Sequence, residues 1–386
     1  MFLTATNLAH YLLSRGTITV DDIVNDAFMA MEAGRRNINF KVYRGDKPGL
    51  FIKQARVNHP ETTGSIYREA AVYELGRSSA AFAPLREVAP TLVDYDPQRH
   101  TVTIELMPRA ENLNEHHLRI GGFPERVGRL QGRALGAYHR GGAQMLADPA
   151  DVAAFPRTPP WIFSMARNAE TIMPSMSGAS QQLVGVLRQT PALAGGLDVL
   201  SALWSPRGLV HGDIKWDNIV LVDQADEDSA LCVIDWELAD VGDTAWDVGC
   251  ALAAYVQYWL FTVPADPSQP DPAILIPHAP RPIEAIRPAL RAFWEEYRRA
   301  AGLTPAEATQ ELFRAVLYSA GRLVLTTFEL LPAAPHLTPT TALFLRLAAA
   351  IFSDPQRALA EIYGLSATET STLTRHAGTA QAMAAE

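Results

Sequence analysis

The spacing of apolar residues changes character several times between residues 1 and 107. Residues 1–33 follow a helical period in two pieces, and Thr19 or Asp21 is well placed to cap the second piece. Apolar and polar residues then alternate as in strands, with a further helical stretch between two pairs of strands. The elements expected after residue 33 are strands at 39–43 and 50–54, a helix at 65–77, and strands at 91–95 and 101–107. Together they predict a small sheet with one helix.

The rest of the chain has a mainly helical pattern. Apolar residues recur at helical spacing after Pro124 and near 181–203, 244–261, 284–300, 306–331 and 341–363. Prolines interrupt this pattern at 155–160 and at 264–282, which predicts surface loops there. The change from the mixed to the helical pattern predicts a domain boundary near Arg109–Leu113.

Composition narrows the classes of partner and compartment. The 386 residues carry a net charge of -9 with a sequence pI near 5.6, which does not favour a nucleic-acid partner. No apolar run reaches the roughly 20 residues needed to cross a bilayer, and Met1–Val20 lacks the features of a signal peptide. Cys232 and Cys250 lie among apolar neighbours, as free thiols do in a reducing compartment. The sequence therefore predicts a soluble cytoplasmic protein without a membrane partner.

The candidate chemistry lies in the polar stretch His211–Asn218 and in the apolar strand at 231–234 that ends at Asp235. Phosphoryl transfer asks a protein mainly for positioning and for neutralisation of phosphate charge. Magnesium prefers oxygen ligands, and the Asn218 amide and the Asp235 carboxylate can supply them. Asp213 precedes Asn218 within the same loop and could accept the proton of an acceptor hydroxyl. This ordered set predicts the catalytic centre of a kinase.

These motifs resemble the signature of the aminoglycoside phosphotransferase and choline kinase-like family, relatives of the protein kinases. The resemblance rests on His211–Asn218, on Ile234–Glu237 and on Gly242–Asp247. It implies that Asp213 is the catalytic aspartate and that Asn218 and Asp235 bind Mg²⁺. It also implies that the last residue of the third motif, Asp247, braces the catalytic loop.

The resemblance covers about residues 34–350 and implies an α+β, bilobed protein kinase-like fold. Such a fold has a small antiparallel-sheet N-lobe and a larger, mainly helical C-lobe. The expected organisation is a helical extension at 1–33, a nucleotide-binding N-lobe at 34–108, a catalytic and acceptor-binding C-lobe at 109–365, and a disordered tail at 366–386. The tail is expected to be disordered because it has few large apolar residues.

A kinase centre also requires a lysine and a glutamate upstream. Lys53 ends the strand at 50–54 and could reach the α- and β-phosphates. Glu69, on the following helix, is the expected partner of this lysine. Glu74 competes for this role, but it lies five positions further on and therefore on a different part of the helix surface.

The remaining nucleotide contacts are expected from a loop and a hinge. The loop Gly34–Asn39 has a single glycine, and its amides, its two arginines and the Asn37 side chain could contact phosphate. The same residues could equally form a solvated polar turn. The hinge is expected at Glu105–Met107, where backbone groups of Glu105 and Met107 would bind the adenine edge.

Two residues of the catalytic loop bear on regulation and on the acceptor. Gly212 stands where protein kinases regulated by activation-loop phosphorylation usually carry arginine, so no such regulation is predicted. Lys215 stands where serine/threonine protein kinases carry lysine, and it could contact the transferred phosphate as a point charge. Asp217 is expected to be a solvated loop acid, and Glu237 to face the acceptor or support the metal. His139 is expected to serve packing or hydrogen bonding.

The sequence therefore predicts an ATP- and Mg²⁺-dependent O-phosphotransferase that acts on a hydroxyl of a small molecule, aminoglycoside-like or another natural product. Catalysis is assigned to Asp213 and Lys215, nucleotide binding to Lys53 and Glu69 with the loop and hinge, and metal binding to Asn218 and Asp235. A kinase acting on Ser or Thr of a precursor peptide is the alternative that Lys215 suggests. A pseudokinase binding module is an alternative of another class. Nothing in the sequence indicates the oligomeric state.

Overall fold

The computed structural model describes residues 2–25, 28–34, 37–56, 60–107, 110–147, 153–222, 230–266, 268, 271–331 and 334–366. By their internal contacts the residues form two compact units. The first unit comprises Met1–Ile120, Gly141–Pro156 and His211–Val241, and the second comprises Gly121–Arg140, Arg157–Val210 and Gly242–Glu386. The segment with the candidate chemistry thus belongs to the same unit as the N-terminal residues.

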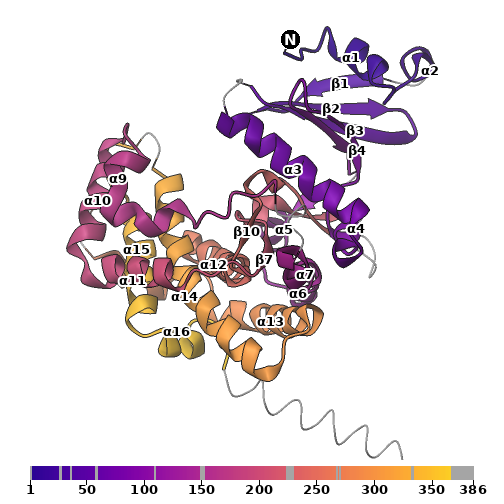
Figure 1. Cartoon of the computed structure of the whole chain (residues 1–386). Coiled ribbons are helices and arrows are strands. Elements are labelled where there is room, and N and C mark those ends of the chain that lie inside the picture. Colours follow the sequence, from indigo (N-terminus) through magenta and orange to yellow (C-terminus); the bar gives the residue numbers. More distant parts are fainter. Residues whose placement is uncertain are drawn as a thin grey trace, which may run out of the picture. The chain divides into compact units, whose positions relative to one another are not determined.

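The first unit contains a five-stranded antiparallel sheet in the order β1-β2-β3-β5-β4 (Figure 1). Its strands are β1 (Phe28–Glu32), β2 (Ile38–Arg44), β3 (Lys47–Gln54), β4 (Leu92–Asp96) and β5 (Thr101–Glu105). Lys53 lies opposite Asn39, and Phe51 lies opposite Lys41. Because successive side chains of a strand alternate between faces, these four side chains project from one face of the sheet.

The two faces of this sheet pack against different helices. α1 (Leu8–Ser14) and α2 (Val20–Val24) lie on one face, and α3 (Pro60–Ser78) lies on the other (Figure 1). Apolar side chains of the first face form a core with the N-terminal helices, and these are Leu8, Leu12, Phe40, Val42, Leu50 and Ile52. Each is at most 1% exposed, so burial of about 1.5–3 kcal/mol per side chain fixes the register of β2 and β3.

The expected helical extension is wrong in its last part, because Phe28–Glu32 is a strand. Phe28 and Ala30 pack against the core, whereas Met29 and Met31 are about half exposed. Their alternation is that of an edge strand, but the exposed side chains are apolar too, which hides the period of two in the sequence. β1 pairs with β2, so the segment Ala33–Asn37 connects the first two strands of the sheet.

The rest of the first unit presents the polar motif at one end of a small antiparallel sheet of order β6-β8-β9. Its elements are η1 (Ala80–Phe82), α4 (Leu85–Val88), β6 (Glu111–Asn112), α5 (Leu113–Ile120), α7 (Gly142–Ala147), η3 (Trp216–Asn218), β8 (Ile219–Val222), β9 (Ala230–Val233), η4 (Trp236–Leu238) and β10 (Asp240–Gly242), which ends in the second unit. Ile219 of β8 lies opposite Val233 of β9. The residues that precede β8 and those that follow β9 therefore meet at the same end, where Ile234 N donates to Asn218 O at 2.9 Å.

The second unit is mainly helical, as the periodicity predicts. Its elements are α6 (Glu125–His139), η2 (Trp161–Ser164), α9 (Met165–Ile172), α10 (Gly178–Gln189), α11 (Pro191–Leu203), β7 (Gly208–Val210), α12 (Thr244–Thr262), η5 (Pro272–His278), η6 (Ile283–Ile286), α13 (Arg287–Ala301), α14 (Pro305–Glu329), α15 (Pro339–Ser353) and α16 (Pro355–Glu361). The segment expected near 181–203 is divided in two because Pro191 starts a new helix. The predicted tail lies almost entirely outside the described residues.

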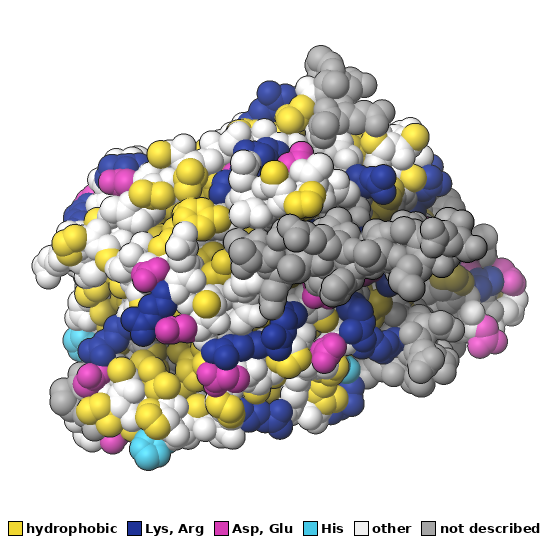
Figure 2. All heavy atoms as spheres, turned by 90° about the horizontal axis from the view of Figure 1, so that it is seen from below, with side chains coloured by type: hydrophobic (Ala, Val, Ile, Leu, Met, Phe, Trp, Pro, Cys, Tyr) yellow, Lys and Arg dark blue, Asp and Glu magenta, His cyan; other side chains and the backbone are white. Residues whose placement is uncertain are grey.

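Helices α6 and α13 pack closely through glycines at every fourth position. A Cβ on Gly128 or Gly132 would lie 2.2 Å from a backbone oxygen of α13, and one on Gly136 would lie 2.6 Å from another. An ion pair also joins the two helices, between Arg133 and Glu296 at 2.8 Å. Figure 2 shows basic and acidic side chains intermixed on the face that it draws. No helix within the described part of the chain is long and apolar enough to span a membrane.

Candidate active site

One lysine of the first unit is surrounded by three carboxylates. Lys53 Nζ lies 2.8 Å from Glu69 Oε2 and 3.1 Å from Glu237 Oε2, and it also donates to Asp235 Oδ1. Lys53 and Glu69 are buried at 5% and 2% exposure. Lys53 reaches this position because it projects from the face of β3 opposite the core, toward α3. The competing residue Glu74 instead lies at the surface, 3.6 Å from Arg77.

This group of side chains, called the lysine cluster, carries more negative than positive charge. Burial by itself lowers the pKa of Lys53, but the carboxylates of Glu69, Asp235 and Glu237 outweigh it, so the pKa is raised. Burial also opposes ionisation of Asp235, and the Lys53 ammonium nevertheless lowers the pKa of that carboxyl. For Glu69 burial prevails and raises the pKa, although Lys53 opposes it. One ammonium thus faces more carboxylate charge than it neutralises, which favours a further cation.

The loop of residues 211–218 holds Asp213 between two side-chain donors. Lys215 Nζ donates to Asp213 Oδ2 at 2.6 Å, and Asn218 Nδ2 donates to the same oxygen at 3.1 Å. Asn218 Nδ2 also donates to the backbone oxygen of Asp213 at 2.9 Å. Because the amide nitrogen is used in this way, the amide oxygen of Asn218 is the atom that can serve as a metal ligand.

Two further residues explain the shape of the loop. His211 is fully buried, accepts from Asp213 N at its Nδ1 at 3.2 Å, and donates from Nε2 to Ile234 O at 2.9 Å. The imidazole thereby joins the loop of residues 211–218 to the end of β9. Gly212 has φ +82°, and a Cβ there would lie 2.5 Å from Leu238 O, so no other residue fits without movement of the backbone. This requirement gives a structural reason for glycine at the position where regulated protein kinases carry arginine.

Asp235 occupies a left-handed backbone conformation with φ 66° and ψ 55°. That conformation costs a non-glycine residue about 1–2 kcal/mol, so its surroundings must hold it. The turn directs the carboxylate toward Lys53 while 37% of the side chain stays exposed. Asp235 can therefore contact a ligand in the cavity while it accepts from Lys53.

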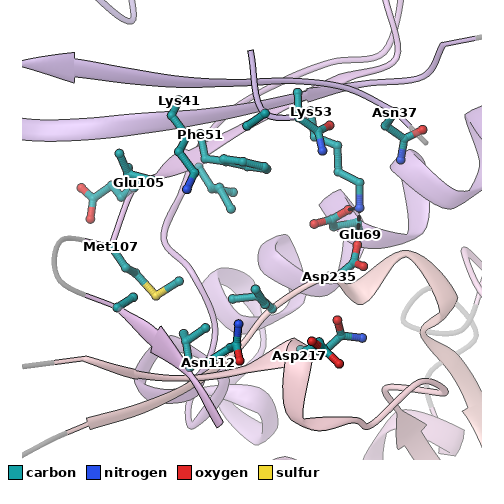
Figure 3. A pocket seen from close by; sticks show the side chains of 18 of the residues that line it. Asn37, Lys41, Phe51, Lys53, Glu69, Glu105, Met107, Asn112, Asp217 and Asp235 are labelled. Carbon is teal, nitrogen blue, oxygen red and sulfur yellow. Dashed lines mark hydrogen bonds and ion pairs between the residues drawn. The ribbon is translucent and has the colours of Figure 1, made fainter. Parts of the chain in front are cut away.

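A cavity of about 550 Å³ in the first unit borders the lysine cluster. The predicted residues that line it are Asn37, Lys53, Glu69, Glu105, Met107, Asn218 and Asp235, and Asp213 and Lys215 adjoin it through Asn218. Figure 3 shows Lys41, Phe51 and Lys53 extending into the cavity from the sheet. Asp217 is exposed, as expected of a solvated loop acid, and it also lines the cavity.

Two described residues of the segment between β1 and β2, Ala33 and Asn37, line the cavity. A Cβ on Gly34 would lie 2.3 Å from Asn37 O, so the single glycine is needed for the turn. Asn37 Nδ2 donates to Glu237 Oε2 at 3.1 Å. Asn37 thus connects this loop to the lysine cluster. Arg35 and Arg36, named above as candidates for phosphate contact, lie outside the described residues.

Sequence reasoning missed two residues of this region, Lys41 and Arg68. Lys41 lines the cavity, and Arg68 donates to the backbone of Glu237. A compositional signal could have found Lys41, because only four of the 33 Lys and Arg residues are lysine. Three of these four, at positions 41, 53 and 215, lie at the cavity or beside it. Arg68 gives no comparable signal.

In the second unit, His139 and Asp247 belong to a buried hydrogen-bonded group. Asp247 Oδ2 accepts from Tyr138 OH at 2.9 Å and lies 3.3 Å from His139 Nε2. His139 Nδ1 lies 3.0 Å from Tyr297 OH. His139 therefore has the packing and hydrogen-bonding surroundings predicted for it. The bracing role of Asp247 toward the catalytic loop stays a prediction.

The profile of the phosphotransferase enzyme family APH matches residues 32–303, more than half of the chain. The chain belongs to this family. It is a phosphotransferase of the protein kinase-like fold, with the small antiparallel sheet and the mainly helical remainder that the sequence predicts. No curated protein matches the chain.

Several solved structures share the fold of this chain at low identity. Plasmodium vivax ethanolamine kinase matches with TM-score 0.55 and 14% identity, over 92% of this chain and 90% of its own. A microcompartment-associated aminopropanol kinase matches with TM-score 0.53 and 16% identity, over 94% and 99%. The GDP complex of an aminoglycoside 2'-phosphotransferase-IIIa mutant matches with TM-score 0.51 and 12% identity, over 93% and 99%. At these identities the likeness is one of fold.

Proposed function

We propose that this phosphotransferase transfers the γ-phosphate of ATP, with Mg²⁺, to a hydroxyl of a small molecule. The observation that carries the proposal is the lysine cluster at the border of a cavity of about 550 Å³. Its excess of carboxylate charge suits a divalent cation, and its ammonium suits a phosphate. Both would be supplied together by a magnesium nucleotide.

The donor set fits a metal that is shared with a nucleotide. Among the described residues no group of three or more His, Cys, Asp or Glu side chains is arranged to hold a metal by itself. Asn218 Oδ1 and the partly exposed Asp235 carboxylate would hold Mg²⁺, which keeps water and phosphate oxygens as its other ligands. Bound Mg²⁺ supplies charge neutralisation to the phosphates. Lys53, held by Glu69, is placed to bind the α- and β-phosphates.

Asp213 and Lys215 would act on the acceptor. We assign to Asp213 the orientation of the acceptor hydroxyl and the removal of its proton. Lys215 places a positive charge 2.6 Å from Asp213 Oδ2, and so near the place that an acceptor hydroxyl bound to Asp213 would occupy. An ammonium there would stabilise charge on the transferred group.

The acceptor class is inferred from charge and from the structural neighbours. The neighbours named above are kinases of ethanolamine, of aminopropanol and of an aminoglycoside, as their names state. Each of these acceptors carries amino groups beside its hydroxyls. A net charge of -9 suits a cationic acceptor of this kind. An amino alcohol or an aminoglycoside-like natural product is therefore the preferred acceptor.

A second candidate acceptor is a Ser or Thr side chain of a precursor peptide. The observation in its favour is Lys215, the residue that serine/threonine protein kinases carry at this position, in contact with Asp213. A peptide would require a longer contact surface than a small molecule.

The experiment is mass spectrometry after incubation with ATP and Mg²⁺ of three acceptor sets: amino alcohols, aminoglycosides, and peptides with Ser or Thr. The Asp213→Asn variant serves as the matched control. We expect a mass gain of one phosphate on a small molecule with the wild type and none with the variant. Phosphorylation confined to peptides would overturn the preferred acceptor in favour of the second candidate. A wild-type protein that shows neither Mg²⁺-dependent nucleotide binding nor ATP hydrolysis would contradict the proposed reaction and favour a binding module.

A further inference from the structure

Arg68 links helix α3 to the segment that carries the proposed metal ligand. Its Nε and Nη2 atoms both donate to the backbone oxygen of Glu237, at 3.1 and 3.0 Å. Arg68 directly precedes Glu69, which lies 2.8 Å from Lys53. Consecutive residues of a helix point about 100° apart, so one turn of α3 reaches both Lys53 and the segment after β9.

The segment after β9 needs such donors because it leaves regular structure. Asp235 is left-handed, and the short turn η4 follows it. Backbone oxygens in such a turn have no ladder partner and need another donor when they are shielded from water. The indole of Trp236 donates to Val233 O at 2.9 Å, and His211 donates to Ile234 O at 2.9 Å. Arg68 donates in the same way to Glu237 O, but it comes from helix α3 and not from the segments around β9.

The side chain of Glu237 is also held from two directions. Its Oε2 accepts from Asn37 at 3.1 Å and lies 3.1 Å from Lys53 Nζ. The fork of Arg68 fixes the backbone of the same residue. A bidentate guanidinium also restricts orientation, which a lysine ammonium at that position would not do.

We propose that Arg68 is a positioning residue, which holds residues 235–237 in the conformation in which the Asp235 carboxylate can bind a magnesium nucleotide. The inference rests on the proposed function, because it takes Asp235 as a metal ligand. It goes further in assigning α3 a second task besides holding Lys53. Side chains that orient a metal ligand from outside the first coordination sphere typically contribute 10–100-fold to metal affinity.

The test compares ATP binding with and without Mg²⁺ in the wild type, Arg68→Met, Arg68→Lys and the control Arg77→Met. Arg77 lies on the same helix, and its side chain is 57% exposed. We expect Arg68→Met to raise the Mg²⁺ concentration for half-saturation about tenfold, with metal-free ATP affinity unchanged. Arg68→Lys keeps the charge but not the fork, and should fall between the wild type and Arg68→Met. Arg77→Met should match the wild type.

Three results would overturn the inference. One is an unchanged Mg²⁺ dependence in a folded Arg68→Met protein. Another is an equal loss of ATP affinity with and without Mg²⁺, which would show a general structural role. If Arg68→Met does not fold, the third result is Arg68→Lys with the same Mg²⁺ dependence as the wild type, which would also contradict the inference. A wild-type protein that binds no nucleotide contradicts the proposed function itself, which distinguishes the two failures.

Discussion

Each unit of this phosphotransferase contains a basic side chain among carboxylates, and the two clusters are completed differently. In the second unit, Arg314 lies 2.8 Å from Asp243 and 2.6 Å from Glu311. Hydroxyl groups and one histidine ring complete this cluster and the neighbouring Asp247, and they come from Thr244, Tyr138, Tyr297, Tyr318 and His139. Its charged residues are buried, and Asp243 is fully inaccessible.

In the first unit, Lys53 faces three carboxylates beside a cavity, and Asp235 keeps 37% of its side chain exposed. Uncharged side chains donate here too, Tyr73 to Glu69 and Asn37 to Glu237, but the three carboxylates line the cavity and Asp235 is partly exposed to it. A cluster closed by hydroxyl groups contributes to the fold, because buried charges must be paired and hydrogen-bonded. A cluster left open beside a cavity is suited to bind a cation. The comparison thus distinguishes the closed cluster around Arg314, which contributes to the fold, from the open cluster around Lys53, for which we propose ligand binding.

The largest expected effect is on turnover, in the loop next to the open cluster. Asp213→Asn removes the proposed proton acceptor and keeps the size of the side chain. We expect kcat to fall by about 10²–10⁴-fold, the usual contribution of a general base, with ATP affinity retained. Steady-state kinetics with the identified acceptor measures this, with the exposed turn variant Asp46→Asn as control. Full turnover in Asp213→Asn would remove Asp213 from the mechanism.

The next effect is on stability, in the closed cluster. Arg314→Met leaves Asp243 and Glu311 buried beside each other without their cation. We expect the free energy of unfolding, from urea denaturation, to fall by about 3–5 kcal/mol. The control is Arg346→Met, which removes an exposed ion pair with Asp271 and should cost at most about 1 kcal/mol. If both variants lose the same free energy of unfolding, the closed cluster contributes no more to stability than an exposed ion pair does.

A smaller effect is expected at Lys41, which projects into the cavity from β2 (Figure 3). Lys41→Met should weaken ATP binding about 10–100-fold, since a hydrogen bond to a charged group contributes about 1.5–3 kcal/mol. Calorimetric titration measures this against Lys47→Met, whose lysine lies 2.7 Å from Asp22. An unaltered affinity in Lys41→Met would mean that the lysine only borders the site.

The smallest effect is expected on the free energy of unfolding at alkaline pH, through Tyr318 of the closed cluster. Burial, and then the charge of Asp243, raise the pKa of Tyr318 above its ordinary value of 10.0. A raised pKa gives stability that is fully present below pH 10 and is lost as the pH rises toward the pKa of the folded state. The free energy of unfolding of the wild type should therefore fall above about pH 10. Tyr318→Phe should lessen this slope by up to about 1.4 kcal/mol per pH unit; an unchanged slope would speak against the assignment.

Much of the candidate site could be predicted because its residues lie in compact motifs. His211–Asn218 and Asp235 flank two short strands, and antiparallel pairing of those strands brings the residues to one end. Periodicity places Lys53 at a strand end and Glu69 on the next helix, and the kinase pattern suggests that the two side chains pair. Glu69 and not Glu74 lies beside Lys53, as the helical spacing favours.

The rest depends on contacts between elements, which no local pattern shows. A helix is expected at β1 because its exposed Met29 and Met31 are as apolar as its partly buried Phe28 and Ala30. Arg68 bonds a backbone oxygen 169 positions away, so neither its neighbours nor its spacing indicates the contact. Asp217 has the pattern of a solvated loop acid, and only the arrangement of β8 and its neighbours places it at the cavity.

The central claim, that the open cluster binds a magnesium nucleotide, is tested by the affinity for ATP with and without Mg²⁺. The measurement compares the wild type with Asp235→Asn and, in the closed cluster, Asp243→Asn. The account predicts tighter binding with Mg²⁺ in the wild type, loss of most of that difference in Asp235→Asn, and its retention in folded Asp243→Asn. An affinity that does not depend on Mg²⁺ in the wild type, or the same dependence in Asp235→Asn, would contradict it.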